Sequence, residues 1–150
     1  MSVGIGDRAP AFRLPATGGT TVSLDDLAGG PVVLVFYPGD DTPVCTKQLS
    51  SYSRELNEFE ALDAHVLGIS AQSVESHETF AKKLGLKFPL LADTDKAVAS
   101  LYGTLGPLGF PRRSVFIVDR HGLIRYAHRA IAGLTFRPVS ELIEALGSLT

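Results

Sequence analysis

The feature that most limits the fold of this chain is an unbroken apolar run at residues 32–37, with the sequence VVLVFY. Side chains on a strand point to alternate faces of a sheet, so a strand without polar positions must be covered on both faces. The run is too short for an average helix and is rich in β-branched and aromatic residues. It therefore predicts a central strand in a sheet that carries helices on both sides.

Other segments also have strand patterns, namely residues 65–69, 88–91, 114–118 and 123–127. The last two flank the turn sequence DRHG at residues 119–122, which predicts a β-hairpin. Before the central strand, Gly18 and Gly19 are placed to turn a second, N-terminal hairpin.

Helical patterns lie between these strands. The first pattern is an apolar stripe at spacings of three and four residues, made by Leu49, Tyr52, Leu56, Phe59 and Leu62. In the next, Ser73 is a favoured N-cap and Gly85 is placed to end the helix in a left-handed conformation. Shorter helices are expected over residues 96–102 and from Pro138 onward.

Helical crossovers join parallel strands, whereas hairpins join antiparallel ones. The order of elements therefore predicts an α/β, thioredoxin-like fold: a central mixed β-sheet with helices on both faces and an N-terminal β-hairpin. No repeat, low-complexity stretch or linker divides the chain, so residues 1–150 are predicted to form a single domain.

Composition excludes several classes of function. Apolar residues make up 45% of the chain and charged residues 20%, and the formal net charge is -2, which gives no basic footprint for nucleic acid or anionic membrane. No apolar segment is long enough to span a bilayer, and no leader pattern precedes residue 12. We expect a cytoplasmic protein that binds neither nucleic acid nor membrane.

The chain has a single cysteine, Cys45, so it cannot form a disulfide within itself. The four histidines lack the spacing and companion cysteines of a zinc site, which predicts no metal. Each is expected to be a surface or turn residue: His65, His77, His121 and His128.

Cys45 lies in the segment FYPGDDTPVCTKQ, between the central strand and the first helix. If Thr42 is the N-cap, Pro43 takes the first helical position and Cys45 falls in the first turn. Unpaired backbone N–H groups and the helix dipole favour a thiolate there. Cys45 also precedes the apolar stripe, which begins at Leu49. These features favour a nucleophile over a buried core cysteine.

Pro38, Thr42 and Cys45 form the pattern P-x-x-x-T-x-x-C, which resembles the active-site signature of the peroxiredoxins. The flanking residues are similar in particular to the bacterioferritin-comigratory-protein (peroxiredoxin Q) branch. The resemblance covers nearly the whole chain, including residues 6–12 (GDRAPAF) and 113–119 (RSVFIVD). It implies a thiol-dependent peroxidase that reduces hydrogen peroxide and organic hydroperoxides without a cofactor.

The same resemblance implies roles for single residues. The Cys45 thiolate would attack the peroxide and become a sulfenic acid. Thr42 would hydrogen-bond the peroxide, Pro38 would shield the pocket from water, and Arg113 would stabilise the negative charge. Arg112 is an adjacent rival for the arginine role.

The spacing to Phe116 favours Arg113 over Arg112. Gln48, one turn after Cys45, is a candidate hydrogen-bond partner of that arginine, although a solvated helix residue is an equal interpretation.

Many members of this branch have a second, resolving cysteine five residues after the first, where this chain has Ser50. The resemblance therefore implies a one-cysteine mechanism in which an external thiol regenerates Cys45. Thioredoxin, glutaredoxin or a low-molecular-weight thiol are the candidate reductants. A monomer or weak homodimer is expected.

Alternative functions remain open at this point. A peroxide sensor that passes oxidation to a partner protein would share the first chemical step. A cysteine hydrolase would need a base such as His65 or His121, and neither lies in an evident motif. A dithiol oxidoreductase is disfavoured because the chain has no Cys-x-x-Cys pair.

Overall fold

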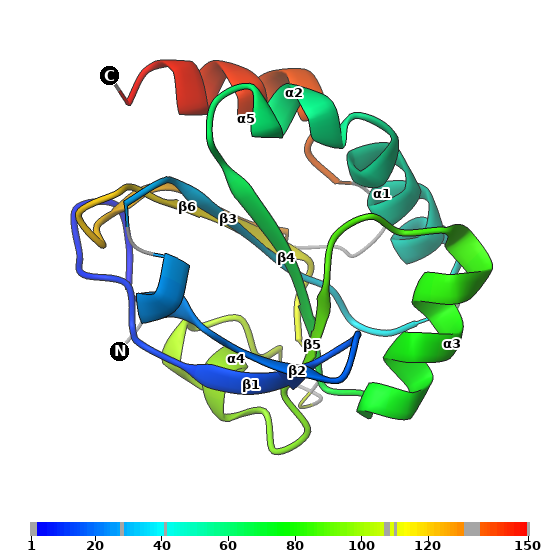
Figure 1. Cartoon of the computed structure of the whole chain (residues 1–150). Coiled ribbons are helices and arrows are strands. Elements are labelled where there is room, and N and C mark those ends of the chain that lie inside the picture. Colours follow the sequence, from blue (N-terminus) through cyan, green and yellow to red (C-terminus); the bar gives the residue numbers. More distant parts are fainter. Residues whose placement is uncertain are drawn as a thin grey trace.

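A mixed sheet of seven strands, in the order β2-β1-β5-β4-β3-β6-β7, forms the centre of the molecule (Figure 1). The computed structural model describes residues 3–27, 29–40, 42–106, 109, 111–130 and 136–149. At the centre, β3 (Val32–Phe36) is parallel to β4 (His65–Ser70), which is parallel to β5 (Leu90–Ala92). Every residue of β3 is buried, as its apolar sequence predicts.

Antiparallel hairpins complete the two sides of the sheet. On one side, β6 (Ser114–Val118) pairs with β3, and β7 (Ile124–Arg129) pairs with β6. On the other, β1 (Arg13–Ala16) and β2 (Thr20–Ser23) form the N-terminal hairpin beside β5. Gly18 and Gly19 turn this hairpin with positive φ angles of 84° and 69°, which glycine adopts without strain. Both predicted hairpins are confirmed.

Helices pack on both faces of the sheet, as predicted (Figure 1). One face carries α1 (Pro43–Arg54), α2 (Leu56–Glu60), α3 (Val74–Leu84) and α5 (Val139–Gly147). The other carries α4 (Ala97–Leu101) and a 3₁₀ turn, η1 (Leu24–Leu27). None of the helices in the described ranges is long and apolar enough to cross a membrane.

The apolar stripe does not form one helix, which corrects the sequence interpretation. The helix breaks at Glu55, with φ −102° and ψ 19°, so that α1 and α2 are separate. The other four residues of the stripe are buried as predicted, namely Leu49, Tyr52, Leu56 and Phe59. Leu62 lies beyond the end of α2 and is 36% exposed. Spacings of three and four residues continue across a one-residue break, so the pattern could not locate it.

Other boundaries differ by one or two residues. β5 begins at Leu90 rather than at residue 88, because Pro89 has no N–H to donate to a neighbouring strand. β7 continues to Arg129, two residues further than predicted, because His128 and Arg129 pair with β6 despite their polarity. In α3, Ser73 accepts a hydrogen bond from the Ser76 N–H at 3.1 Å, as predicted.

Candidate active site

The loop between β3 and α1 sets the position of Cys45. Thr42 is the N-cap of α1 by its extended backbone, Pro43 takes the first helical position, and the Thr46 N–H donates to the Thr42 carbonyl at 2.9 Å. The Thr42 hydroxyl does not cap the helix; it donates instead to the Gly39 carbonyl at 3.1 Å. The helix therefore begins where the sequence predicted, and the hydroxyl closes the loop.

Cys45 is fully buried, at 0% exposure, in the core between α1 and the sheet. It lies one helical turn before Leu49 and two turns before Tyr52, and all three share the buried face of α1. The interpretation that Cys45 stands apart from the apolar stripe is therefore wrong, because the stripe begins at Cys45 itself. Burial alone would suit a core cysteine, so its polar neighbours decide its character.

Arg113 is the neighbour that distinguishes Cys45 from an ordinary core thiol. It is 3% exposed, and its Nη1 donates to the Cys45 Sγ at 3.2 Å and to the Gln48 Oε1 at 2.8 Å. The pairing of Ser114 with Phe36 brings Arg113 beside the end of β3, where α1 starts. A guanidinium at this distance stabilises a thiolate.

Arg112 turns away from the sulfur, because adjacent residues in an extended chain point in opposite directions. Its Nε donates to the Ala130 carbonyl at 3.1 Å, on the β7 side. The contact with Cys45 thus belongs to Arg113, the residue that the spacing to Phe116 favoured.

Gln48 continues the network away from Cys45. Its side chain is buried, and its Nε2 donates to the Tyr52 hydroxyl at 3.3 Å, while that hydroxyl donates to the Arg137 carbonyl at 2.5 Å. Burial raises the pKa of Tyr52 to about 12, so its phenol stays neutral. Of the two interpretations of Gln48, the partner of the arginine is the one observed. Tyr52 was missed as a polar residue because it fits the apolar stripe.

The other site candidates lie nearer the surface. Pro38 is half-buried directly after Tyr37, and Thr42 is exposed at the helix start. Ser50 is half-buried on α1, at the position where the resolving cysteine of the branch would stand.

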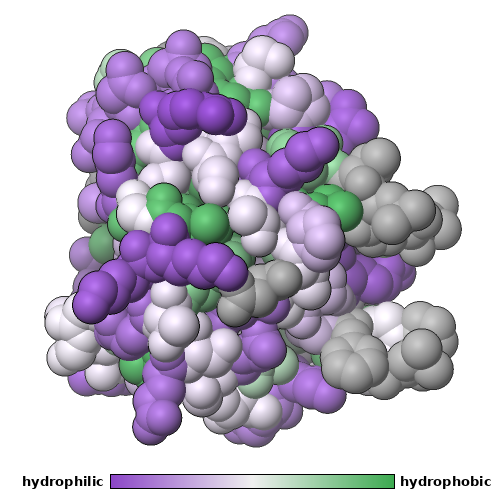
Figure 2. Space-filling view, turned by 90° about the vertical axis from the view of Figure 1, so that its right-hand side faces the viewer, coloured by the Kyte–Doolittle hydropathy of each residue, from purple (hydrophilic) through white to green (hydrophobic). Residues whose placement is uncertain are grey.

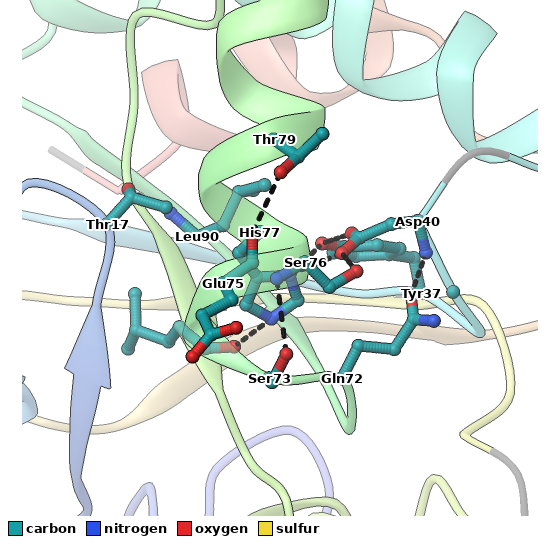
Figure 3. A network of polar contacts seen from close by, with 12 residues as sticks. Thr17, Tyr37, Asp40, Gln72, Ser73, Glu75, Ser76, His77, Thr79 and Leu90 are labelled. Carbon is teal, nitrogen blue, oxygen red and sulfur yellow. Dashed lines mark hydrogen bonds and ion pairs between the residues drawn. The ribbon is translucent and has the colours of Figure 1, made fainter.

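His77 contradicts the expectation that every histidine lies at the surface or in a turn. It is 0% exposed on α3, with Nδ1 at 2.8 Å from the Asp40 Oδ2 and Nε2 at 3.0 Å from the Leu91 carbonyl (Figure 3). A signal was available, because His77 and the buried Phe80 are three residues apart and so share one face of α3.

Residues 5–127 match the AhpC/TSA family. The chain belongs to this family. It is a peroxiredoxin, a thiol-dependent peroxidase that reduces peroxide at the expense of a thiol, and its single cysteine fits a one-cysteine mechanism.

Individual peroxiredoxins show the same relationship. Peroxiredoxin bcp of Coxiella burnetii is 40% identical over 131 residues, which cover 83% of this chain and 87% of the relative. The chloroplastic peroxiredoxin Q of Oryza sativa subsp. japonica is 36% identical over 148 residues, 94% of this chain but 64% of the longer plant protein. The solved peroxiredoxin Q of Xanthomonas campestris has a TM-score of 0.84 and 31% identity, over 92% of this chain and 90% of its own. The resemblance to this branch and the thioredoxin-like fold are confirmed.

Proposed function

We propose that this peroxiredoxin reduces hydroperoxides with Cys45 as its only redox centre and with Thr42, Arg113 and Pro38 as the surrounding peroxide site. The observation that carries the proposal is the 3.2 Å contact between the Arg113 guanidinium and the Cys45 sulfur. The thiolate attacks the terminal oxygen of the peroxide, and the O–O bond breaks. Cys45 becomes a sulfenic acid, and the departing oxygen takes a proton and leaves as water or an alcohol.

Charge movement explains the role of Arg113 in this step. Negative charge passes from sulfur to the departing oxygen, and a cation already beside the sulfur stabilises both ends of that movement. Gln48 holds the guanidinium in place through its Oε1, at 2.8 Å.

The loop before α1 supplies the remaining two roles. The Thr42 hydroxyl donates its own proton to the Gly39 carbonyl, so its lone pairs are oriented to accept the peroxide O–H. Pro38 has no N–H to bind water and carries an apolar ring, so at this half-buried position it would limit the access of water.

Reduction requires a thiol from outside the chain. One external thiol attacks the Cys45 sulfenic acid and releases water, and a second reduces the mixed disulfide, so each peroxide consumes two thiols. Ser50 has no sulfur, so it cannot take the place of the first external thiol. Because Cys45 is fully buried, the start of α1 must open locally before the external sulfur can reach it. The candidate reductants are thioredoxin, glutaredoxin or a low-molecular-weight thiol.

This cycle also suggests a location and an assembly state. The cytoplasm keeps the required thiols reduced, which favours a cytoplasmic enzyme. The face that includes α3 is mostly hydrophilic, with only scattered apolar residues (Figure 2). A stable obligate interface is usually more apolar than this face. We propose a monomer or weak homodimer, as the resemblance to the branch implies.

Treatment with one equivalent of hydrogen peroxide tests the first step. We expect one added oxygen per chain, located at Cys45 by mass spectrometry with a sulfenic-acid probe. Cys45→Ser should lose all peroxide consumption. Ser50→Ala, one turn further along the same helix, should react at the normal rate because it removes no sulfur. Recovery of reduced Cys45 after this treatment would overturn the proposal.

Steady-state assays with each candidate thiol separate a peroxidase from a peroxide sensor. A peroxidase turns over many equivalents of peroxide with at least one reductant. A chain that forms the sulfenic acid but stops after one equivalent with all of them would instead be a sensor.

A further inference from the structure

A second buried polar cluster lies beside the active-site loop, centred on Asp40 (Figure 3). The Asp40 carboxylate accepts hydrogen bonds from the Tyr37 hydroxyl at 2.6 Å and from the Ser76 hydroxyl at 2.7 Å. The His77 Nδ1 lies 2.8 Å from its Oδ2, and the two side chains are 2% and 0% exposed. Groups from the end of β3 and from α3 thus converge on one loop residue.

The protons of His77 follow from its partners. A carbonyl oxygen only accepts hydrogen bonds, so the nitrogen facing Leu91, Nε2, carries a proton. Burial acts to raise the pKa of Asp40, but the hydrogen bonds from His77, Tyr37 and Ser76 outweigh it and lower the pKa below its usual value. Nδ1 lies on the carboxylate side of the ring, so Asp40 and His77 form a buried hydrogen-bonded pair.

The surroundings favour an ionised Asp40. Ser76 and His77 lie in the first turns of α3, so the Asp40 carboxylate faces the positive end of that helix. Tyr37 contributes a neutral phenol, because its pKa is raised. Burial is the largest cause, followed by the charge of Asp40 and, to a smaller degree, that of Cys45.

Asp40 connects this cluster to the peroxide site. It lies midway between Pro38 and Thr42, and its backbone N–H donates to the Gln72 side-chain oxygen, just before α3. The residue before it, Gly39, supplies the carbonyl that accepts the Thr42 hydroxyl. One side of the loop is therefore fixed to α3, while α1 holds the other.

We propose that the Asp40–His77 pair is a positioning element of the peroxidase: it holds residues 38–40 and Thr42 so that the Thr42 hydroxyl and the Cys45 sulfur face the same peroxide molecule. The inference rests on the proposed roles of Thr42 and Cys45. It assigns no contact with substrate to Asp40 or His77, which act through the loop.

Two reagents distinguish positioning from a general loss of structure. Reaction with hydrogen peroxide needs Thr42 in place, whereas alkylation by iodoacetamide needs only an accessible Cys45 thiolate. We expect Asp40→Asn to slow the peroxide reaction by roughly ten- to a hundredfold, since small displacements of reacting groups have effects of this size. Its alkylation rate should be unchanged or faster. Equal slowing of both reactions would overturn the proposal.

His77→Gln provides the second variant, because glutamine can still donate to the Leu91 carbonyl but has no second ring nitrogen to meet Asp40 at the same time. It should show the same split between the two reagents. If Asp40→Asn fails to fold, the result for His77→Gln decides whether the pair has a positioning role. A normal peroxide rate in a folded His77→Gln variant would overturn the proposal.

Gly85→Ala is the matched control for the stability of α3. Gly85 ends α3 with φ +63°, so an alanine strains the far end of the same helix, with no atom within 4 Å to meet its methyl group. It should lower thermal stability but keep the peroxide rate within about twofold. A rate as slow as that of Asp40→Asn would assign the effect to the stability of α3 and overturn the positioning role.

A double variant separates this inference from the proposed function. If Asp40 acts through Thr42, then Asp40→Asn should add little slowing in a Thr42→Val background, and independent, additive effects would overturn the positioning role. A normal rate in Thr42→Val alone would overturn the proposed role of Thr42. A normal rate in Asp40→Asn, with a slow Thr42→Val, would overturn only the positioning role.

Discussion

Two buried polar clusters flank the loop between β3 and α1, and they differ in how they compensate charge. In the Arg113 cluster, a guanidinium donates to the Cys45 sulfur and to the Gln48 amide oxygen. In the Asp40 cluster, a carboxylate meets the His77 imidazole and two hydroxyl groups. The first places a cation against a group that reacts, and the second surrounds a carboxylate with hydrogen-bond partners from the protein itself.

This difference separates reactivity from positioning. A charge that is already paired and fully hydrogen-bonded has little left to offer a substrate, but its pairing fixes the groups that carry it. A cation beside a thiolate keeps its role when the negative charge moves on to oxygen. Loss of Arg113 should therefore act on the chemical step, and loss of Asp40 on the geometry and stability of the loop.

The comparison of Arg113→Ala with Arg112→Ala tests this distinction most directly and has the largest expected effect. Arg113→Ala should slow the reaction of Cys45 with peroxide by about 10²–10³-fold, or ~3–4 kcal/mol, as the removal of one charge-stabilising donor does in other enzymes. Arg112→Ala removes a hydrogen bond to the Ala130 carbonyl and should change the rate by less than about threefold. Stopped-flow measurement of single-turnover peroxide reduction compares the two, and equal effects would show that the arginine assignment is wrong.

Asp40→Asn tests the other cluster through the pH dependence of stability, with an intermediate effect. Hydrogen bonds lower the pKa of Asp40 in the folded protein against the opposing effect of burial. A carboxyl group with a lowered folded-state pKa stabilises the protein above its unfolded pKa, and this contribution disappears as pH falls through the folded-state value. We expect the variant to be less stable than the wild type by ~2 kcal/mol at pH 7.

The difference between wild type and Asp40→Asn should shrink as pH falls below about 4, the usual pKa of an aspartate. Urea unfolding at several pH values measures it. Asp25→Asn, at an exposed position of η1, is the control and should stay within about 0.5 kcal/mol of wild type throughout. A pH-independent difference for Asp40→Asn would mean that the lost contacts do not depend on the charge of Asp40.

The two clusters also differ in how far the sequence predicts them. Cys45, Thr42 and Pro38 lie within one short motif, and Arg113 directly precedes a strand whose apolar pattern is clear. Both the fold and these candidates could therefore be predicted. Asp40 and His77 are 37 residues apart in the chain. Their contact depends on the angle at which α3 packs beside β5, which helical periodicity does not specify. The break at Glu55 was hidden for a related reason, since the apolar spacing is the same on both sides of it.

Tyr52→Phe has the smallest expected effect and tests how far the Arg113 cluster extends. Its hydroxyl accepts from Gln48 and donates to the Arg137 carbonyl, so it supports the residue that holds Arg113. Removal of the hydroxyl should cost ~1 kcal/mol of stability and slow the peroxide reaction by only about two- to threefold, because Gln48 retains its own bond to Arg113.

Tyr126→Phe is the matched control, since it removes a half-buried hydroxyl that donates to Glu141 between β7 and α5. It should leave the peroxide rate nearly unchanged, because the contacts that lead from that hydroxyl to Gln48 pass through Glu141, Arg137 and Tyr52 in turn. Stopped-flow rates and urea unfolding of the two variants give the comparison. A tenfold or larger loss of rate in Tyr52→Phe alone would mean that Gln48 cannot orient the guanidinium without the phenol. The Arg113 cluster would then, like the Asp40 cluster, depend on positioning by a network that reaches well beyond the reacting sulfur.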